Sequence, residues 1–204
     1  IGDTGAYASV GMKVLERAAG HATGAYHVDA VEVRSRAVYT NNIPCGAMRG
    51  FGVNQINFAV ESCVDELCEM GGFDRWQIRY DNALTPGGMT STGQVLQSGI
   101  GIRKTLEAVK DVFQQSRHAG IACGIKNTGI GNGVPDTGKV KIVIESPEKI
   151  LIHQGWTEMG QGVYTMAVQF FCEVTGLSPE IVEVRVDTAE ESESGMTTAS
   201  RGTS

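Results

Sequence analysis

The sequence predicts a mixed α/β (α+β) fold with two subdomains, each a sheet with helices packed on one face. Apolar residues recur with the helical period in some stretches and with the strand period of two in others. A strand-like stretch, a glycine-rich loop and a helix-like stretch follow one another twice, over residues 38–70 and 150–176. At 204 residues and 41% hydrophobic composition, the chain is long enough to bury a substantial core.

We expect the first subdomain to span residues 1–117. Its main helix is predicted over residues 54–70, where apolar side chains share one stripe and acidic side chains lie opposite. Gly71 and Gly72 end this helix, and Asp74 is the expected N-cap of a short helix that follows. The other expected elements are helices over 9–19 and 102–116, a half-buried strand over 28–40 and a long loop over 85–101.

The second subdomain is expected over residues 118–204. The predicted elements are strands over 120–130, 139–144 and 150–155, a helix over 163–176 and a last strand over 181–186. The chain starts at Ile1 without a methionine and stops in a small polar run, TTASRGTS. We therefore interpret it as an internal segment of a longer polypeptide.

Charge and cysteine content exclude several classes of function. Lys and Arg number 17 against 23 Asp and Glu, a net charge of −6, and the basic residues are scattered, which disfavours a nucleic-acid or anionic membrane surface. No apolar run reaches the length of a membrane span and no signal segment opens the chain, so we expect a cytoplasmic protein. Five cysteines without a CxxC pair predict neither a disulfide framework nor a metal site.

The loop over residues 40–55, TNNIPCGAMRGFGVNQ, is the first candidate site. Its glycines allow close backbone approach, Arg49 offers a planar fork of donors, and Phe51 offers a flat apolar face. The loop precedes a predicted helix, whose free N–H groups and dipole favour an anion. The alternative is an ordinary strand-to-helix turn with Arg49 in solvent.

A second glycine loop, TEMGQG at residues 157–162, also precedes a predicted helix. Two such loops are typical of a site for a phosphate-bearing cofactor. Neither loop is a P-loop or a GxGxxG dinucleotide fingerprint, so glycine content alone does not indicate nucleotide binding. The alternative for this loop is a tight turn with Gln161 in solvent.

Taken together, four stretches resemble the molybdenum-binding (large) subunit of the xanthine dehydrogenase and aldehyde oxidase family, the molybdenum hydroxylases. They are TNNIPCGAMRGFGVNQ at 40–55, ESCVDELCEMGGFDRWQIRYDNAL at 61–84, TEMGQGVYTMAVQ at 157–169 and GMTTASRGTS at 195–204. The pair of loops at this separation is far more specific than either loop alone.

The resemblance implies a fold of the molybdopterin-binding-domain type and a molybdenum–molybdopterin cofactor, free or as a dinucleotide. The metal takes its sulfur ligands from the pterin, so no protein metal ligand is expected. The residues that match the family's cofactor-binding positions are Arg49, Gly160, Gln161, Ala199 and Ser200. Phe51 matches the aromatic residue that packs on the substrate ring, while Cys123 and Gly124 imply a second pocket wall that is smaller than in xanthine-specific relatives or different from it.

The same resemblance implies an oxidoreductase that oxidises a C–H bond of a purine-like or other N-heterocycle, or of an aldehyde, with water as the oxygen source. The family's base glutamate would lie outside this segment, so no catalytic residue is assigned and the isolated segment is expected to be inactive. Iron–sulfur clusters and FAD would sit on other domains or subunits of an oligomeric parent. Two alternatives stay open: a non-catalytic anion- or cofactor-binding module, and an aryl-CoA thioester reductase of the same family.

Overall fold

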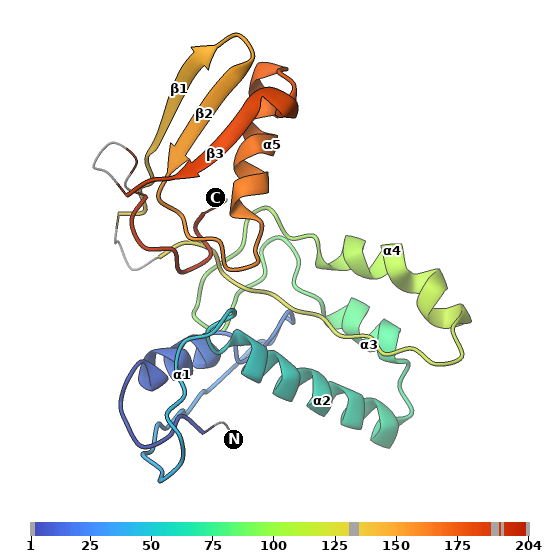
Figure 1. Cartoon of the computed structure of the whole chain (residues 1–204). Helices are drawn as coiled ribbons and strands as arrows, with labels where there is room; N and C mark the ends of the chain where they lie inside the picture. Colours follow the sequence, from blue (N-terminus) through green and yellow to red (C-terminus); the bar gives the residue numbers. More distant parts are fainter. Residues whose placement is uncertain (1–2, 131–134, 189–191, 193, 203–204) are drawn as a thin grey trace. The chain divides into compact units, whose positions relative to one another are not determined.

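The computed structural model describes residues 3–130, 135–188, 192 and 194–202 of the chain. These form two compact units, Ile1–Lys126 and Asn127–Ser204. Among the described residues there are five α-helices, one short 3-10 helix and one three-stranded sheet (Figure 1), which confirms the predicted mixed α/β class. The subdomain boundary predicted at residue 118 stays a prediction.

The four helices of the first unit form where the apolar spacing predicts them. The N-cap Asp74 accepts a hydrogen bond from the Gln77 N–H at 2.7 Å, and Gly72 ends the longest helix with a φ of 67°, as expected from its lack of a side chain. The helices are α1 (Gly11–Ala19), α2 (Val53–Gly71), α3 (Arg75–Asn82) and α4 (Ile102–Gln115).

The core of the first unit lies where α3 meets α4. Trp76 and Leu106 are buried there, and the Trp76 Nε1–H donates to the Leu106 carbonyl at 2.8 Å. The Trp76 ring also stacks on Tyr80, with ring centres 4.8 Å apart. Burial of an indole with a satisfied N–H contributes both apolar area and direction to this packing. Ile121 and Cys123 pack against the same cluster.

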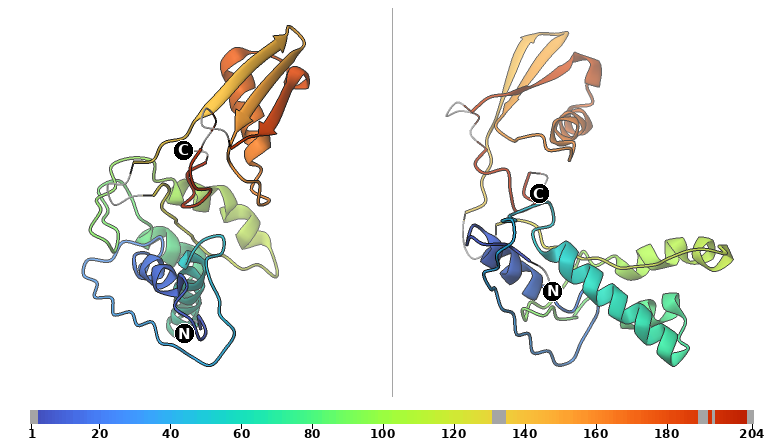
Figure 2. Two further views of the ribbon diagram at one scale, coloured as in Figure 1. Left: turned by 60° about the vertical axis from the view of Figure 1, so that its left-hand side comes forward. Right: turned by 60° about the horizontal axis from the view of Figure 1, so that its bottom comes forward.

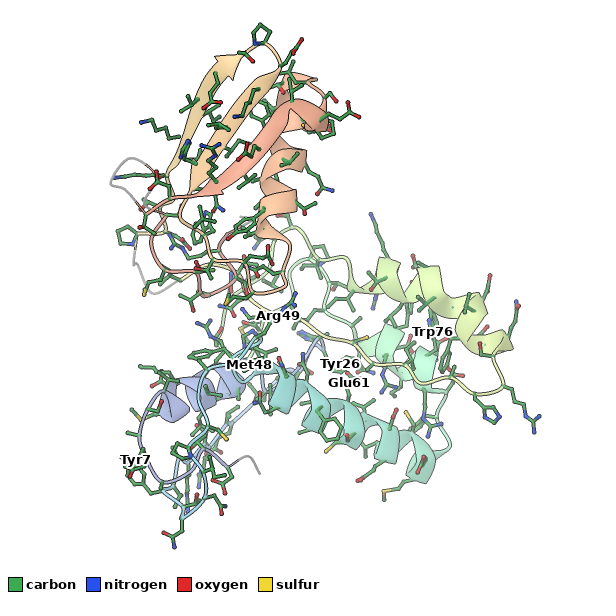
Figure 3. The ribbon with its side chains drawn as sticks, viewed as in Figure 1. Tyr7, Tyr26, Met48, Arg49, Glu61 and Trp76 are labelled. Atoms are coloured by element: carbon green, nitrogen blue, oxygen red, sulfur yellow. The ribbon has the colours of Figure 1, made fainter. Side chains whose placement is uncertain are left out.

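A buried polar network joins α2 to α3 (Figure 3). The Arg79 side chain is fully buried and donates to Glu61, which Figure 3 labels on α2, and to Asp65, each at 2.8 Å. Tyr26, also buried, donates its hydroxyl hydrogen bond to Glu61. Burial lowers the pKa of Arg79, but the hydrogen bonds to Glu61 and Asp65 outweigh it and raise that pKa overall. The arginine therefore stays charged inside the unit.

Two of the predicted strands are wrong. Residues 28–40 form no strand: the Thr40 N–H donates to the Gly5 carbonyl, but no strand of the described chain pairs with this stretch, and Val31 and Val33 are exposed. Residues 120–130 are also without a strand. Their alternation has another cause, since Ile121 and Cys123 pack against the helical core while Ala122 between them is exposed.

The second unit is a small sheet with one helix on one face (Figure 2). Its central strand β2 (Lys149–Gln154) pairs antiparallel with β1 (Val140–Ser146) and parallel with β3 (Val182–Val186). The parallel pair is connected through α5 (Val163–Thr175) and the 3-10 turn Pro179–Ile181. A parallel connection requires such a crossover, and the buried Ile150, Leu151 and Ile152 of β2 reflect its central place. None of the described helices is long and apolar enough to cross a membrane.

Candidate functional site

The RGFG loop of the first unit has three consecutive residues in the left-handed region. The φ angles are 93° at Gly50, 52° at Phe51 and 100° at Gly52. Such a conformation is strained for phenylalanine and is therefore held by its surroundings. The Phe51 N–H donates to the Met48 carbonyl at 2.8 Å, and the Val53 N–H donates to the Gly50 carbonyl at 3.1 Å.

Close packing explains why glycine stands at positions 50 and 52. A Cβ on Gly52 would lie 2.1 Å from the Val14 carbonyl oxygen of α1, and one on Gly50 would lie 1.6 Å from the Asn54 side chain. The Asn54 Nδ2 in turn donates to the Arg49 carbonyl at 2.8 Å. The loop is thus fastened to α1 and to the first turn of α2, so the positions of Arg49 and Phe51 follow from the two helices.

This geometry leaves a cation next to an open helix end. Arg49 is exposed, and none of the described residues forms an ion pair or hydrogen bond with its guanidinium. The first residue before α2, Gly52, has no side chain to cap the helix. Phe51, which lies between Arg49 and Gly52 in the sequence, is half-buried. Figure 3 shows Arg49 beside the start of α2. Free donors and a positive dipole end beside an arginine suit an anionic group.

The second glycine loop, residues 157–162, differs because its helix end is already occupied. One carboxylate oxygen of Glu158 accepts hydrogen bonds from the N–H groups of Gly160 at 2.8 Å and Gly162 at 3.0 Å. Backbone hydrogen bonds from Gly162, Gly160, Tyr164 and Val163 lower the pKa of this carboxyl group. The anion predicted at the start of α5 is therefore a side chain of the chain itself.

The Gln161 side chain also forms its hydrogen bonds within its own loop. Its Nε2 donates to the Thr157 carbonyl at 2.7 Å, and its Oε1 accepts from the Met159 N–H. The residue is exposed, but its amide is not simply solvated as the tight-turn alternative assumed. With Gly160 and Gly162 at φ values of 87° and 76°, the loop is a compact structure closed by two side chains.

A neighbouring loop, residues 194–202, carries Ala199 and Ser200. Both have positive φ angles, 57° and 55°, which is rare for residues with a side chain. The loop lies beside the glycine loop, because the Thr157 N–H donates to the Thr197 Oγ1 at 2.9 Å. Within the second unit, the two loops joined by this hydrogen bond carry four of the six residues predicted for the site: Gly160, Gln161, Ala199 and Ser200.

Arg201, which was not among the residues predicted from the sequence, holds this loop. Its side chain is buried, pairs with Asp136, and donates to the carbonyls of Ser194 at 3.3 Å and Met196 at 3.1 Å. Its guanidinium lies over the Trp156 ring, just before the glycine loop. The sequence carries one indication of this role, because Arg201 is a single arginine within a run of small residues.

The cysteines and the acidic side chains form no metal centre in the part of the chain that the structure describes. All five cysteines are free. Burial raises the pKa of Cys123, which packs against the core, and this disfavours the thiolate. Gly124 is exposed beside Asn57 of α2. The smaller pocket wall expected at Cys123 and Gly124 stays a prediction.

Comparison with known proteins identifies what the two units resemble. The sequence profile described as "Molybdopterin cofactor-binding domain" matches residues 1–83, and a second profile of that description matches residues 96–204. Over 215 residues the chain is 33% identical to a probable xanthine dehydrogenase component of Bacillus subtilis (strain 168), a match that covers 100% of the chain and 29% of that protein.

A further relative and a solved structure are also similar to the chain. The "Nicotinate dehydrogenase large molybdopterin subunit" of Eubacterium barkeri is 44% identical over 110 residues, which is 54% of the chain and 26% of that protein. The crystal structure of the aldehyde oxidoreductase from Desulfovibrio desulfuricans ATCC 27774 superimposes with a TM-score of 0.78 at 24% identity, over 98% of the chain and 24% of that structure. The chain thus spans less than a third of the length of each of these relatives.

Proposed function

The chain belongs to the molybdopterin cofactor-binding family, and we propose that it forms part of the cofactor and substrate site of a molybdenum hydroxylase. The reaction is the oxidation of a C–H bond in a purine-like or other N-heterocycle, or in an aldehyde, with water as the oxygen source. The relatives named for xanthine and nicotinate dehydrogenation support the heterocyclic class of substrate.

The observation that carries the proposal is the unpaired Arg49 beside the uncapped start of α2. An anionic pterin phosphate or an oxo group on the metal would be held there by charge-assisted hydrogen bonds from the guanidinium and by free backbone N–H groups. The left-handed turn at Gly50–Gly52 keeps these donors in place without side chains that would block approach. The residues present therefore fit an anionic cofactor at this loop.

In the second unit, the cofactor contact falls to Gly160, Gln161, Ala199 and Ser200. The two loops that carry them are joined by the Thr157–Thr197 hydrogen bond, so they can bind one ligand together. Because the α5 helix end is filled by Glu158, the contribution of these residues is made by loop backbone and by short side chains. When bound, the molybdenum cofactor supplies the two-electron redox chemistry that no side chain of this chain provides.

Phe51 is proposed to bind the substrate ring. It is half-buried, it directly follows Gly50, and its backbone is held at a φ angle of 52°. A planar heterocycle gains from an aromatic face in a largely apolar pocket. Electrons would leave through iron–sulfur and FAD groups on other domains or subunits, in line with the names of relatives that are themselves subunits.

The proposal is tested on the polypeptide that joins this chain to the rest of the enzyme. Its molybdenum and pterin content is measured after purification, and turnover is assayed with nicotinate, purines and aldehydes. Bound molybdenum with turnover of at least one of these substrates is the expected result. A folded preparation that binds no molybdenum would overturn the proposal. The 204-residue chain by itself is expected to show neither metal nor turnover.

A further inference from the structure

The TEMGQG loop contains a glutamate whose carboxylate faces only backbone donors in the interactions described for it. Glu158 accepts hydrogen bonds from the N–H groups of Gly160 and Gly162, and the N–H groups of Val163 and Tyr164 at the start of α5 also favour its charged form. The N–H groups of Gly162, Val163 and Tyr164 are among those that a helix leaves without an intrahelical partner at its first turn. A single side chain, five residues before the first residue of α5, thus faces these donors.

We propose that Glu158 is a positioning residue: its charged carboxylate fills the anion position at the start of α5 and thereby fixes the conformation in which Gly160 and Gln161 are presented to the cofactor. The residue just before the helix, Gly162, has no side chain that could do this. Gly160 and Gly162 both have positive φ angles, so the loop has little conformational preference of its own and depends on these hydrogen bonds.

The second support for the fixed loop is Gln161, whose amide bonds to Thr157 and Met159 on the other side. Glu158 and Gln161 thus engage backbone groups on both sides of Gly160. The N–H groups of residues 159, 160 and 162 all donate hydrogen bonds in this arrangement. An anionic ligand at the start of α5 would have to displace Glu158, so the fixed loop presents its outer atoms instead.

Charge matters to this role. The carboxylate is stabilised by four peptide N–H groups and by the positive end of the helix dipole. Among the groups nearby, Tyr164 follows on α5, and Arg201 of the adjacent 194–202 loop is paired with Asp136. We therefore expect protonation of Glu158 itself to release the loop amides.

The test uses amide resonances of the 204-residue chain labelled with nitrogen-15, so that it does not depend on cofactor or activity. On lowering the pH, the N–H resonances of Gly160, Gly162, Val163 and Tyr164 are expected to shift together, with one midpoint below that of an ordinary glutamate. Glu158→Gln keeps a neutral acceptor and should abolish this common titration. Glu158→Ala removes the acceptor and should speed hydrogen exchange at Gly160 and Gly162 by roughly five- to tenfold.

Glu173→Gln is the matched control, because it removes a carboxylate from the other end of the same helix. It should leave the common titration unchanged. A titration that persists in Glu158→Gln, or loop resonances that do not move with pH in the unaltered chain, would overturn the proposal. If Glu158→Ala does not fold, the comparison of Glu158→Gln with the unaltered chain still decides.

A further measurement connects the loop to the cofactor and rests on the proposed function. In the longer enzyme, acid-induced loss of the pterin should follow the same midpoint and should lose that pH dependence in Glu158→Gln. If the enzyme carries no pterin, the proposed function fails while the titration in the chain still tests Glu158. If the pterin is bound but its release is identical in both proteins, the positioning role is wrong.

Discussion

The guanidinium carbon of Arg201 lies 4.9 Å from the centre of the Trp156 ring. A cation over the face of an indole is attracted by about 0.5–2 kcal/mol, more when it is shielded from water as here. Trp156 directly precedes the glycine loop and Arg201 follows Ser200, so this contact joins the two loops proposed to bind the cofactor. It complements the Thr157–Thr197 hydrogen bond between the same loops.

The first prediction concerns the pH dependence of the second unit through Asp136. Hydrogen bonding and charge from Arg201 hold the pKa of Asp136 below its ordinary value of 3.8. Because the folded pKa is depressed, the pair stabilises the unit above the unfolded value. That stability is lost as the pH falls through the folded pKa. The difference in Tm between the unaltered chain and Asp136→Asn should therefore be largest at about pH 6 and shrink as the pH falls below the ordinary value of 3.8.

The two tryptophans allow this to be measured one unit at a time, because Trp76 lies in the first unit and Trp156 in the second. In a Trp76→Phe background, the fluorescence of Trp156 reports the unfolding of the second unit. Asp111→Asn on α4 serves as the control and should leave this transition unchanged at every pH. A Tm difference for Asp136→Asn that does not vary with pH would contradict the prediction.

The second prediction is that Glu61→Gln strongly destabilises the first unit. Arg79 is fully buried, and removal of the charge of one partner leaves a buried arginine with only Asp65 to balance it. Loss of one partner of a buried ion pair costs about 3–5 kcal/mol. Urea unfolding followed by Trp76 fluorescence in a Trp156→Phe background measures this free energy.

The exposed pair Arg34–Glu32 supplies the contrast. Its two side chains lie 2.7 Å apart, but both are largely in solvent. Exposed pairs are worth about 0–1 kcal/mol, so Glu32→Gln should have almost no effect. Equal losses from Glu61→Gln and Glu32→Gln would show that the Arg79 network does not stabilise the unit.

Helices were predictable because their signals are local. The apolar stripe of residues 54–70 and the cap at Asp74 depend on neighbours within a turn, and both α2 and α3 formed as predicted. The strand over residues 28–40 failed because a strand needs a distant partner that the alternation of Val31 and Val33 does not specify. In β2 the same kind of pattern succeeded, since β1 and β3 are present to pair with it.

In the candidate site, too, features set by neighbouring residues were predictable and features set by distant residues were not. That Arg49 precedes a helix start could be read from spacing alone, and the structure places it there without a partner among the described residues. The group that occupies the start of α5 could not be predicted from spacing, because the choice between an external anion and Glu158 depends on the loop conformation. Arg201 escaped notice for a related reason, as its partners Asp136 and Trp156 are far from it in sequence.

The third prediction is that Arg49→Ala in the longer enzyme reduces cofactor retention far more than Arg34→Ala. Arg49 has no partner among the described residues, whereas Arg34 is an exposed residue paired with Glu32. A charge-assisted hydrogen bond contributes about 1.5–3 kcal/mol, which corresponds to roughly tenfold to a hundredfold weaker binding of the cofactor. Molybdenum and pterin content of the purified variants gives the comparison, and equal content in both would show that Arg49 is an ordinary surface residue.

The last prediction separates two roles for Phe51, substrate stacking and core packing. Phe51→Leu keeps most of the apolar volume at a position with a φ of 52°, where neither residue is favoured, but it removes the aromatic face. Ring contacts contribute about 0.5–1.5 kcal/mol beyond buried area, so kcat/KM for ring substrates should fall several-fold relative to aliphatic aldehydes, with Tm and molybdenum content unchanged. A residue that only packs the loop would behave in the opposite way, because its replacement lowers Tm and leaves the ratio between ring and aliphatic substrates as it was. Measurement of Tm and that ratio on the one variant therefore decides between them.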